Sequence, residues 1–261
     1  MNGTIGGVIV AAGEGTRMGG ALRKVYVPLA GRPLFMHALE KMRSFHVPWI
    51  ALVIHPEELF RTIRILQEAH WIEDDFPGEW ECFPGHIVQI ELAGPTLALY
   101  LVPGGKSRQD SVWAGVRVLE KATYVAVHDA ARPLLSLELW QRLVAVKEAA
   151  RAIVPALPVK DTIKVIEEAK ADLPSRSLRR VWGTLPRASL VAVQTPQLFH
   201  RATLLEALAL GRALQIEVTD EAMLLERFRK RVVVVPGDEA NIKVTTPFDL
   251  SLAEMLLKKS V

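Results

Sequence analysis

The stretch GGVIVAAGEGTRMGGALRKVY, residues 6–26, places an apolar run directly before a loop that is rich in glycine and ends in basic residues. The apolar run predicts a buried strand, and the small residues 11–13 at its carboxyl end let the backbone approach a ligand closely. Backbone amides in this loop, together with Arg17 and Lys24, are suited to bind phosphate oxygens. An ordinary turn with solvated basic residues fits the pattern equally well, so this stretch alone does not decide between the two.

Strand and helix patterns alternate along most of the chain. Short apolar runs at 49–54, 97–102, 124–127 and 153–156 are typical of buried strands, and stretches with apolar residues at helical spacing separate them. This alternation predicts an α/β fold, with a doubly wound and mostly parallel sheet covered by helices on both faces. Ligands of such sheets bind at the carboxyl ends of the strands, where the glycine-containing loop lies. Since no long linker divides the chain, we expect a single domain over residues 1–261.

Two segments interrupt this alternation. Residues 71–95 are rich in aromatic residues, proline and glycine without a clear period, and we expect a surface excursion there. Residues 158–194 contain alternating stretches around an arginine-rich turn, a pattern typical of a long hairpin. A hairpin that projects from a domain has unpaired edges, and a second subunit is a common way of covering them. We therefore predict a β-arm at about 158–194 that takes part in a homodimer.

The composition excludes several classes of protein. Half of the 261 residues are apolar, which favours a folded core, and the net charge of +3 is too small and too scattered to predict nucleic-acid binding. A single cysteine, Cys82, leaves no disulfide framework and no cysteine cluster for zinc. The first apolar run is too short for a signal peptide, and no stretch approaches the roughly 18 apolar residues of a membrane helix. We expect a soluble, cytoplasmic protein that has no nucleic-acid or membrane partner.

Two familiar phosphate-binding motifs fail in this chain. The dinucleotide motif Gly-x-Gly-x-x-Gly fits Gly13 and Gly15, but the third glycine comes one residue late. The acidic residue expected at the end of the next strand is missing as well, since that strand ends at His55. A Walker motif at 105–107 would need a glycine where Tyr100 stands. We therefore exclude both motifs.

A second cluster of polar residues, HDAARP at 128–133, follows the apolar run 124–127. Asp129 at the end of a strand is suited to hold Mg²⁺, which takes carboxylate and phosphate oxygens as ligands. Arg132 is suited to bind a second phosphate by forked hydrogen bonds. An ion pair between these two side chains, or capping of the next segment, explains the same residues without any ligand. We expect His128 to be a packing or hydrogen-bonding residue rather than a catalytic base.

A third cluster lies in NIKVTTPFDL at 241–250. Thr246 and the proline after it form a strong helix start, and Lys243 stands just before it, where a cation can reach a phosphate. The sequence Thr219-Asp220-Glu221 also predicts a helix N-terminus. Simple capping is the role that we expect of its two acids.

Taken together, these motifs resemble the family of 2-C-methyl-D-erythritol 4-phosphate cytidylyltransferases. The matching stretches are AAGEGTRM at 11–18, Lys24, GGKSRQDSV at 104–112, HDAARP at 128–133, PVKDTIK at 158–164, TPQLF at 195–199, TDEA at 219–222 and NIKVTTPFDL at 241–250. Each of them alone is only suggestive, but eight in the right order and spacing are very specific. The chain departs from the family beside Lys24, where Arg23 and Val25 replace the usual proline and glutamine.

The resemblance implies a fold similar to nucleoside-diphosphate-sugar transferases, with a β-arm that helps to build a homodimer. It implies transfer of CMP from CTP to 2-C-methyl-D-erythritol 4-phosphate, with release of pyrophosphate and with Mg²⁺ as the cofactor. Ribitol 5-phosphate cytidylyltransferases, which have the same CTP site, are an alternative, although Ala11-Ala12-Gly13 and Ala130-Ala131 favour the methylerythritol family. A second alternative is a nucleotide-binding regulatory module that has lost its chemistry, and the complete set of charged site residues speaks against it.

The resemblance also implies roles for individual residues. The catalytic cations are Arg17, Lys24, Arg187 and Lys243, of which the arm residue Arg187 would act across the dimer interface. The CTP-binding positions are Ala11, Ala12, Gly13, Gly15, Gly105, Arg108 and Ser111. The positions that line the methylerythritol phosphate site are Arg132, Thr162, Thr195 and Thr219. Asp129 matches the metal-linked carboxylate.

Overall fold

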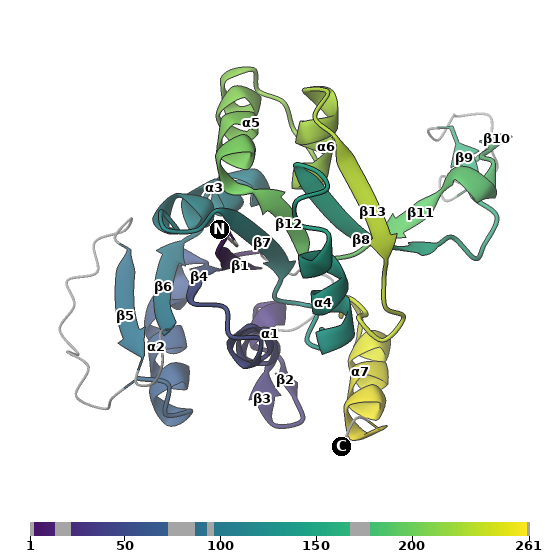
Figure 1. The fold of residues 1–261 in the computed structure, drawn as a ribbon. Helices are drawn as coiled ribbons and strands as arrows, with labels where there is room; N and C mark the ends of the chain where they lie inside the picture. The colour runs from purple at the N-terminus through teal and green to yellow at the C-terminus, as the bar shows by residue number, and fades with distance from the viewer. Residues whose placement is uncertain (1–2, 14–21, 73–86, 93–96, 168–177, 260–261) are drawn as a thin grey trace.

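A large central sheet dominates the computed structural model, which describes residues 3–13, 22–72, 87–92, 97–167 and 178–259 (Figure 1). Its strands are β1 (Ile5–Ala11), β4 (Trp49–Ile54), β5 (Val88–Leu92), β6 (Leu97–Pro103), β7 (Tyr124–Asp129), β8 (Ala152–Pro158), β11 (Val191–Val193), β12 (Gln197–His200) and β13 (Val232–Pro236). Along the sheet they follow the order β11-β8-β12-β7-β1-β4-β6-β5, and β13 pairs with β8.

Parallel pairing dominates the middle of this sheet. Strand β1 lies between β7 and β4, β4 pairs with β6, and all three pairs are parallel. Antiparallel strands lie to either side, with β5 beside β6 and with β12 beside β7. The predicted mostly parallel α/β sheet is confirmed, and its central strands are uniformly apolar because helices cover both of its faces.

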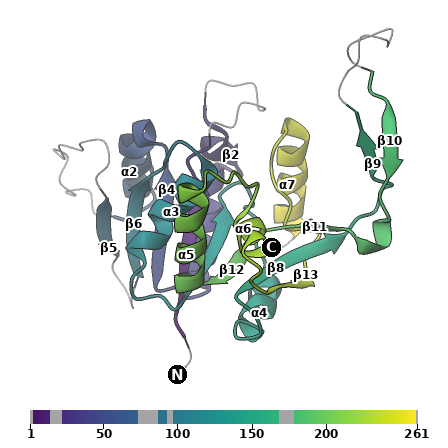
Figure 2. The same ribbon diagram turned by 90° about the horizontal axis from the view of Figure 1, so that it is seen from above.

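Helices cover both faces of the central sheet (Figure 2). The helices are α1 (Leu34–Ser44), α2 (Leu59–Glu68), α3 (Arg108–Val118), α4 (Leu137–Ala145), α5 (Arg201–Ala213), α6 (Glu221–Arg227) and α7 (Pro247–Lys259). Ile9 of β1 belongs to the core cluster that α1, α2 and α4 cover, whereas its neighbour Val8 belongs to the cluster under α3, α5 and α6. Helix α7 packs separately, against Leu29 and Leu34.

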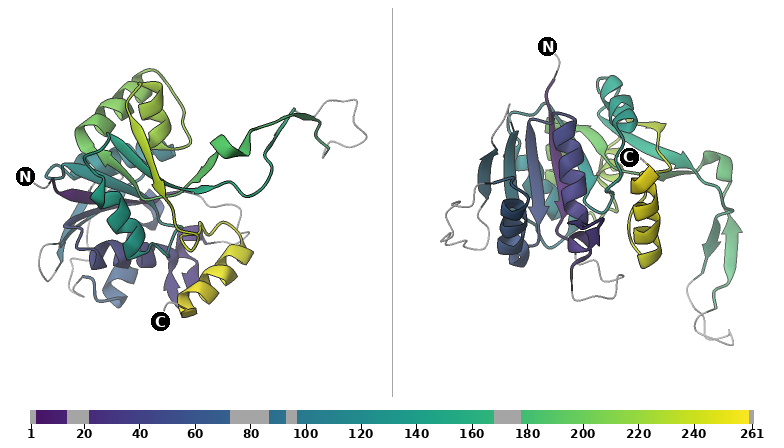
Figure 3. Two further views of the ribbon diagram at one scale, coloured as in Figure 1. Left: turned by 45° about the vertical axis from the view of Figure 1, so that its right-hand side comes forward. Right: turned by 90° about the horizontal axis from the view of Figure 1, so that it is seen from below.

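The hairpin predicted at 158–194 is present and projects from the sheet (Figures 1 and 3). At its base β8 and β11 pair antiparallel, and farther out β9 (Lys164–Ile166) and β10 (Val181–Thr184) form a separate two-stranded sheet. The outer strands carry exposed apolar side chains, among which Trp182 is 74% exposed. The arm therefore presents apolar surface that the rest of the described chain does not cover.

The segment 71–95 is only partly a surface excursion. Residues 73–86 and 93–96 lie outside the described part of the chain, but β5 between them pairs antiparallel with β6 along five residues. Trp71 and Ile72 are buried in the core below α1 and α2. The expectation of an excursion was thus wrong for the edge strand, whose alternating pattern VQIEL is too short to stand out beside the aromatic and proline residues before it.

No helix among the described residues combines the length and the apolar character that a membrane span needs.

Candidate functional site

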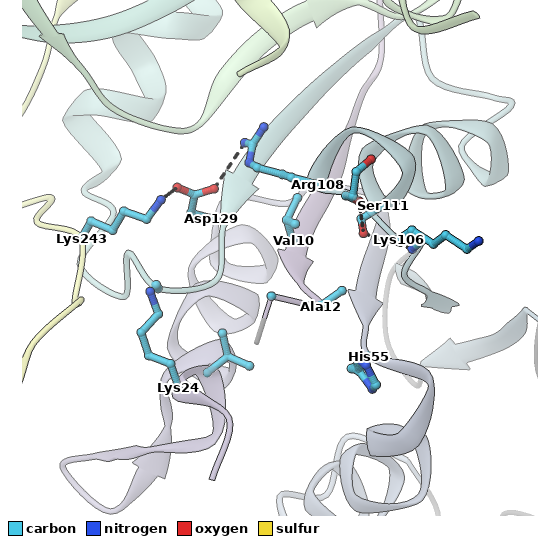
Figure 4. A pocket seen from close by; sticks show the side chains of 14 residues that line it. Val10, Ala12, Lys24, His55, Lys106, Arg108, Ser111, Asp129 and Lys243 are labelled. Atoms are coloured by element: carbon cyan, nitrogen blue, oxygen red, sulfur yellow. Dashed lines mark hydrogen bonds and ion pairs between the residues drawn. The ribbon is translucent and has the colours of Figure 1, made fainter. Parts of the chain in front are cut away.

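A cavity of about 440 Å³ lies at the carboxyl ends of the central parallel strands (Figure 4). Its lining residues are Val10, Ala12, Gly13, Lys24, Val25, His55, Gly105, Lys106, Ser107, Arg108, Ser111, Asp129, Ala131 and Lys243. Strands β1, β4, β6 and β7 run in the same direction, so the segments that follow them meet at one edge of the sheet. The topology therefore gathers the first two motif clusters at this cavity, and the third joins them where the Val244 amide donates to the Ala131 carbonyl at 2.8 Å.

Asp129, the last residue of β7, is the acidic centre of the cavity. Its carboxylate lies 2.7 Å from Nζ of Lys243 and 3.4 Å from Nη2 of Arg108. Burial by itself would raise the pKa of Asp129, but the charges of Arg108 and Lys243 outweigh burial and hold that pKa well below its usual range. Asp129 is therefore ionised at neutral pH and is placed to bind cations.

Thr195 and His128 fix the backbone behind this carboxylate. The Asp129 amide donates to Oγ1 of Thr195 at 3.0 Å, and the same hydroxyl lies 3.1 Å from Nδ1 of His128. We assign the Thr195 hydroxyl as the donor to Nδ1 of His128. The ring proton of His128 is then on Nε2, which donates to the Arg132 carbonyl at 3.0 Å. Burial lowers the pKa of His128 to about 4, so its imidazole is neutral at pH 7. His128 is a hydrogen-bonding residue, as the sequence predicts.

The loop before α3 brings Gly105 and Ser111 together. Ser111 Oγ accepts the Gly105 amide at 3.1 Å and donates to the Ser107 carbonyl at 3.0 Å. A Cβ atom on Gly105 would lie 2.3 Å from Cβ of Asp110, a separation that real Cβ atoms do not show. The tight turn therefore requires glycine at this position, and it presents its backbone to the cavity.

Arg108 connects Asp129 to a second carboxylate, that of Glu221. Nη1 of Arg108 lies 2.5 Å from Oε1 of Glu221, the first residue of α6, which is 1% exposed. Capping, the role expected of both acids, is right for Asp220, which accepts the Met223 amide at 3.0 Å. It is wrong for Glu221, which points into the protein. The sequence holds no signal that separates these two adjacent acids, because the difference depends on how α6 is oriented toward α3.

Lys24, which lines the cavity, begins a short 3-10 helix, η2 (Lys24–Tyr26). The hydroxyl of Tyr26 lies 2.7 Å from Oγ1 of Thr62 on α2, and the guanidinium of Arg23 lies 3.0 Å from Glu57. These contacts fix the turn on both sides of Lys24. Figure 4 shows Lys24 on the same side of the cavity as Asp129, and His55 on the opposite side.

Several predicted site residues are not among the described residues that line this cavity. Nη1 of Arg132 donates to the Asn241 carbonyl at 2.8 Å, and Nη1 of the arm residue Arg187 donates to the Lys160 carbonyl at 2.6 Å. The remaining positions divide as follows: Thr162 is exposed in the arm, Thr219 is exposed before α6, Ala11 is buried at the end of β1, and Gly15 and Arg17 lie outside the described residues. The roles predicted for all of these positions stay predictions.

Comparisons with known proteins agree on one family. The model of the 2-C-methyl-D-erythritol 4-phosphate cytidylyltransferase family matches residues 84–259, and the model of MobA-like NTP transferase domains matches residues 7–82. The curated 2-C-methyl-D-erythritol 4-phosphate cytidylyltransferase of Streptomyces avermitilis is 38% identical over 256 residues, which cover 97% of this chain and 91% of the relative. The enzyme of the same name from Microcystis aeruginosa is 36% identical, with 97% and 98% covered.

Solved structures agree with these relatives. The crystal structure of 4-diphosphocytidyl-2C-methyl-D-erythritol synthase from Anaerococcus prevotii superimposes with a TM-score of 0.73 at 25% identity, covering 99% of this chain and 100% of that one. The cytidylyltransferase from Thermus thermophilus gives a TM-score of 0.67 at 27% identity, with 99% and 100% covered. Both kinds of comparison span nearly the whole chain. The chain therefore belongs to the 2-C-methyl-D-erythritol 4-phosphate cytidylyltransferase family.

Proposed function

We propose that this chain transfers CMP from CTP to 2-C-methyl-D-erythritol 4-phosphate, giving 4-diphosphocytidyl-2-C-methyl-D-erythritol and pyrophosphate. The observation that carries the proposal is the cavity of a cytidylyltransferase-family chain in which Lys24, Lys243 and the ionised Asp129 surround one space. A triphosphate and a second phosphate that are held close together need cations and backbone amides of a glycine-containing loop beside them.

The reaction is a substitution at the α-phosphorus of CTP. A phosphate oxygen of the acceptor forms a bond to this phosphorus, and the bond from the phosphorus to the bridging oxygen breaks as the electron pair leaves with pyrophosphate. The attacking oxygen is already anionic at neutral pH, so no general base has to remove a proton. The structure supports this route, because both ring nitrogens of the buried His128 are engaged in hydrogen bonds and its pKa is lowered by burial.

Catalysis by this chain consists of positioning and of charge neutralisation. Lys24 stabilises the charge that develops on the α-phosphate, and Lys243, next to Asp129, holds the acceptor phosphate for attack. Arg17 assists Lys24, and Arg187 assists Lys243. Each such contact is worth about 3–4 kcal/mol of the barrier, on the scale of other donors that stabilise oxyanions.

The nucleoside of CTP occupies the side of the cavity that Ala12, Gly105 and Ser111 line. Small residues there leave room for a pyrimidine ring. This arrangement leaves the triphosphate on the side of Lys24 and Asp129, where the positive charge is concentrated.

Mg²⁺ is the cofactor that we propose, with Asp129 as its protein ligand. The described residues contain no group of three or more His, Cys, Asp or Glu that suits a metal ion, so within that part of the chain Asp129 is not joined by further such ligands. An ionised single carboxylate fits Mg²⁺ all the same, because this ion is commonly held by one or two carboxylates together with substrate phosphates. When bound, Mg²⁺ neutralises charge on the triphosphate.

A homodimer that forms through the arm is also part of the proposal. The outer strands expose Trp182, Val181 and Ile166, each more than half exposed, on a hairpin that extends away from the sheet. Exposed apolar surface of this kind is suited to a second copy of the chain. Arg187 and Thr162 lie in the same arm, and we propose that they reach the acceptor site of the partner.

We place the reaction in the cytoplasm, where both charged substrates would be available, and propose no nucleic-acid or membrane partner.

An assay with two acceptors tests the proposed reaction. Purified chain is incubated with CTP, Mg²⁺ and either 2-C-methyl-D-erythritol 4-phosphate or ribitol 5-phosphate, and pyrophosphate release is followed. We expect a kcat/KM for methylerythritol phosphate that is larger by at least about a hundredfold, the order expected when buried polar contacts are matched to one acceptor. A preference for ribitol phosphate would assign the chain to the alternative reaction, and no turnover with either acceptor would leave a binding module.

A further inference from the structure

Glu221 is a buried carboxylate for which the reaction described above gives no role. Its side chain is 1% exposed, and its Oε1 atom lies 2.5 Å from Nη1 of Arg108. Its second oxygen, Oε2, is buried and has no hydrogen-bond partner among the described residues. A buried charge costs stability unless it is paired, so the ion pair with Arg108 calls for an explanation beyond packing.

Arg108 is shared unequally between two carboxylates. Nη1 lies 2.5 Å from Glu221, whereas Nη2 lies 3.4 Å from Oδ1 of Asp129, at the outer limit of a hydrogen bond. The guanidinium is a rigid planar fork, so a fork anchored on Glu221 cannot move freely onto Asp129. Arg108 lines the cavity, and its side chain remains 29% exposed.

The unequal sharing matters because Asp129 has only two carboxylate oxygens. Lys243 already lies 2.7 Å from Oδ2, so Oδ1 is the oxygen that Arg108 approaches. A guanidinium released from Glu221 would close on Oδ1 at the 2.7–2.9 Å typical of charged pairs, about half an ångström or more nearer than now. Both oxygens of Asp129 would then be covered by side-chain cations.

We propose that Glu221 is a positioning residue that acts through Arg108: it holds the guanidinium at the cavity wall, facing the CTP phosphates, and keeps it from closing on Asp129. Asp129 thereby stays accessible to a divalent cation that arrives with the nucleotide. The inference rests on the proposed function, since it assigns to Arg108 and Asp129 their places in the CTP site. It gives α6, a helix of seven residues on the sheet face opposite α1, a direct connection to that site.

The substitution Glu221→Gln tests this role, because it keeps the shape of the side chain and removes its charge. The matched control is Asp220→Asn, which alters the adjacent acid that caps α6 and accepts a hydrogen bond from Gln197. Mn²⁺ binding in the presence of CTP is followed by electron paramagnetic resonance, CTP binding by calorimetry, and folding by thermal melting. For E221Q we expect the Kd of Mn²⁺ to rise about tenfold or more, the usual effect of losing an outer partner of a metal site. The D220N control should leave it within about twofold, as for substitutions that touch no site group.

A double-mutant cycle with Arg108→Met separates action through Arg108 from any other effect. R108M removes the competitor for Asp129, so it should not weaken Mn²⁺ binding. It should weaken CTP binding, because the guanidinium that faces the CTP phosphates is lost. In the R108M background, the further change E221Q should leave the Kd of Mn²⁺ unchanged, because the side chain through which Glu221 acts is absent.

Three outcomes would overturn the inference: an E221Q chain that binds Mn²⁺ and CTP like wild type, an equal loss from E221Q with and without Arg108, or an R108M chain that loses Mn²⁺ binding as E221Q does. Should E221Q fail to fold, Glu221→Asp replaces it; it keeps the charge, shortens the reach, and should raise the Kd of Mn²⁺ in the same direction. A wild-type chain that binds CTP and Mn²⁺ but forms no product overturns the proposed function, and the binding comparison still decides the role of Glu221.

Discussion

The stability of the folded chain should fall between pH 7 and pH 5 because of His128. This imidazole is fully buried, and burial lowers its pKa from 6.5 to about 4. The unfolded chain therefore binds a proton at His128 near pH 6.5, whereas the folded chain binds one only near pH 4. A group with a lowered folded-state pKa contributes its stability above the unfolded pKa and loses it as the pH falls toward the folded pKa.

The two pKa values of His128 set the size of this effect. Their difference corresponds to about 3 kcal/mol of unfolding free energy once the pH is below both values, and to about 2 kcal/mol at pH 5. The side chain is 0% exposed, so solvent does not screen this effect. For a domain whose total stability lies in the range of about 5–15 kcal/mol, a loss of this size is easily measured.

Urea unfolding of the wild type and of His128→Gln at pH 7.5, 6 and 5 measures this contribution. Gln can still donate to the Arg132 carbonyl but does not reproduce the contact of Nδ1 with Thr195, so H128Q should be less stable than wild type at pH 7.5. Because Gln does not titrate, the free energy of unfolding of H128Q should fall by about 2 kcal/mol less than that of wild type on going to pH 5. His46→Gln, at an exposed position, is the matched control and should follow the wild-type profile. Parallel pH profiles for wild type and H128Q would refute the neutral, buried assignment of His128.

Three further predictions concern the site and the arm. Arg23 has φ −61° and ψ 136°, angles that proline adopts, so Arg23→Pro should keep kcat near wild type. Arg23→Ala loses the ion pairs with Glu57 and Glu58 without gaining the rigidity of proline, and should lower kcat about two- to fivefold; equal rates for the two variants would show that the turn before Lys24 needs no support. Gly105→Ala should weaken CTP binding about tenfold or more, since its Cβ would meet Asp110, and Gly183→Ala, whose Cβ would meet nothing within 4 Å, should not; calorimetry that finds no difference would contradict the role of the loop. Trp182→Glu should shift sedimentation from dimer to monomer with little change in Tm, and a W182E chain that sediments as a dimer would remove the arm as the interface.

Much of the fold could be predicted because its signals are local. Strands β1 and β4 and the first four residues of β7, 124–127, are apolar runs, and parallel strands bring their carboxyl ends to one edge whatever their order in the sheet. For this reason the strand pattern was enough to place the loop of Lys24 and Asp129 at one edge of the sheet, whereas the grouping of Lys243 with them came from the family resemblance. Strand β5 was missed because five alternating residues give a weak signal within a segment rich in aromatic residues and proline.

The rest depends on orientations that no local pattern contains. Asp220 and Glu221 are chemically alike and adjacent, yet one caps α6 and the other pairs with Arg108, according to the angle at which the helix packs. Thr195 matches a predicted substrate position, but in the structure its hydroxyl supports His128 and Asp129 from within. The proposed placement of Arg187 at an acceptor site requires a second copy of the chain, and a single sequence does not contain that arrangement.

A single-turnover experiment on Lys24→Ala tests the central claim most directly. Enzyme in excess is mixed with CTP labelled at the α-phosphate and with 2-C-methyl-D-erythritol 4-phosphate, and CTP binding is measured separately by calorimetry. The wild type should move the label into 4-diphosphocytidyl-2-C-methyl-D-erythritol, and K24A should do so at least about a hundredfold more slowly while its Kd for CTP changes less than about tenfold. Equal losses of rate and of CTP binding, or a K24A chain as fast as wild type, would contradict the claim that this cavity holds the transition state of cytidylyl transfer.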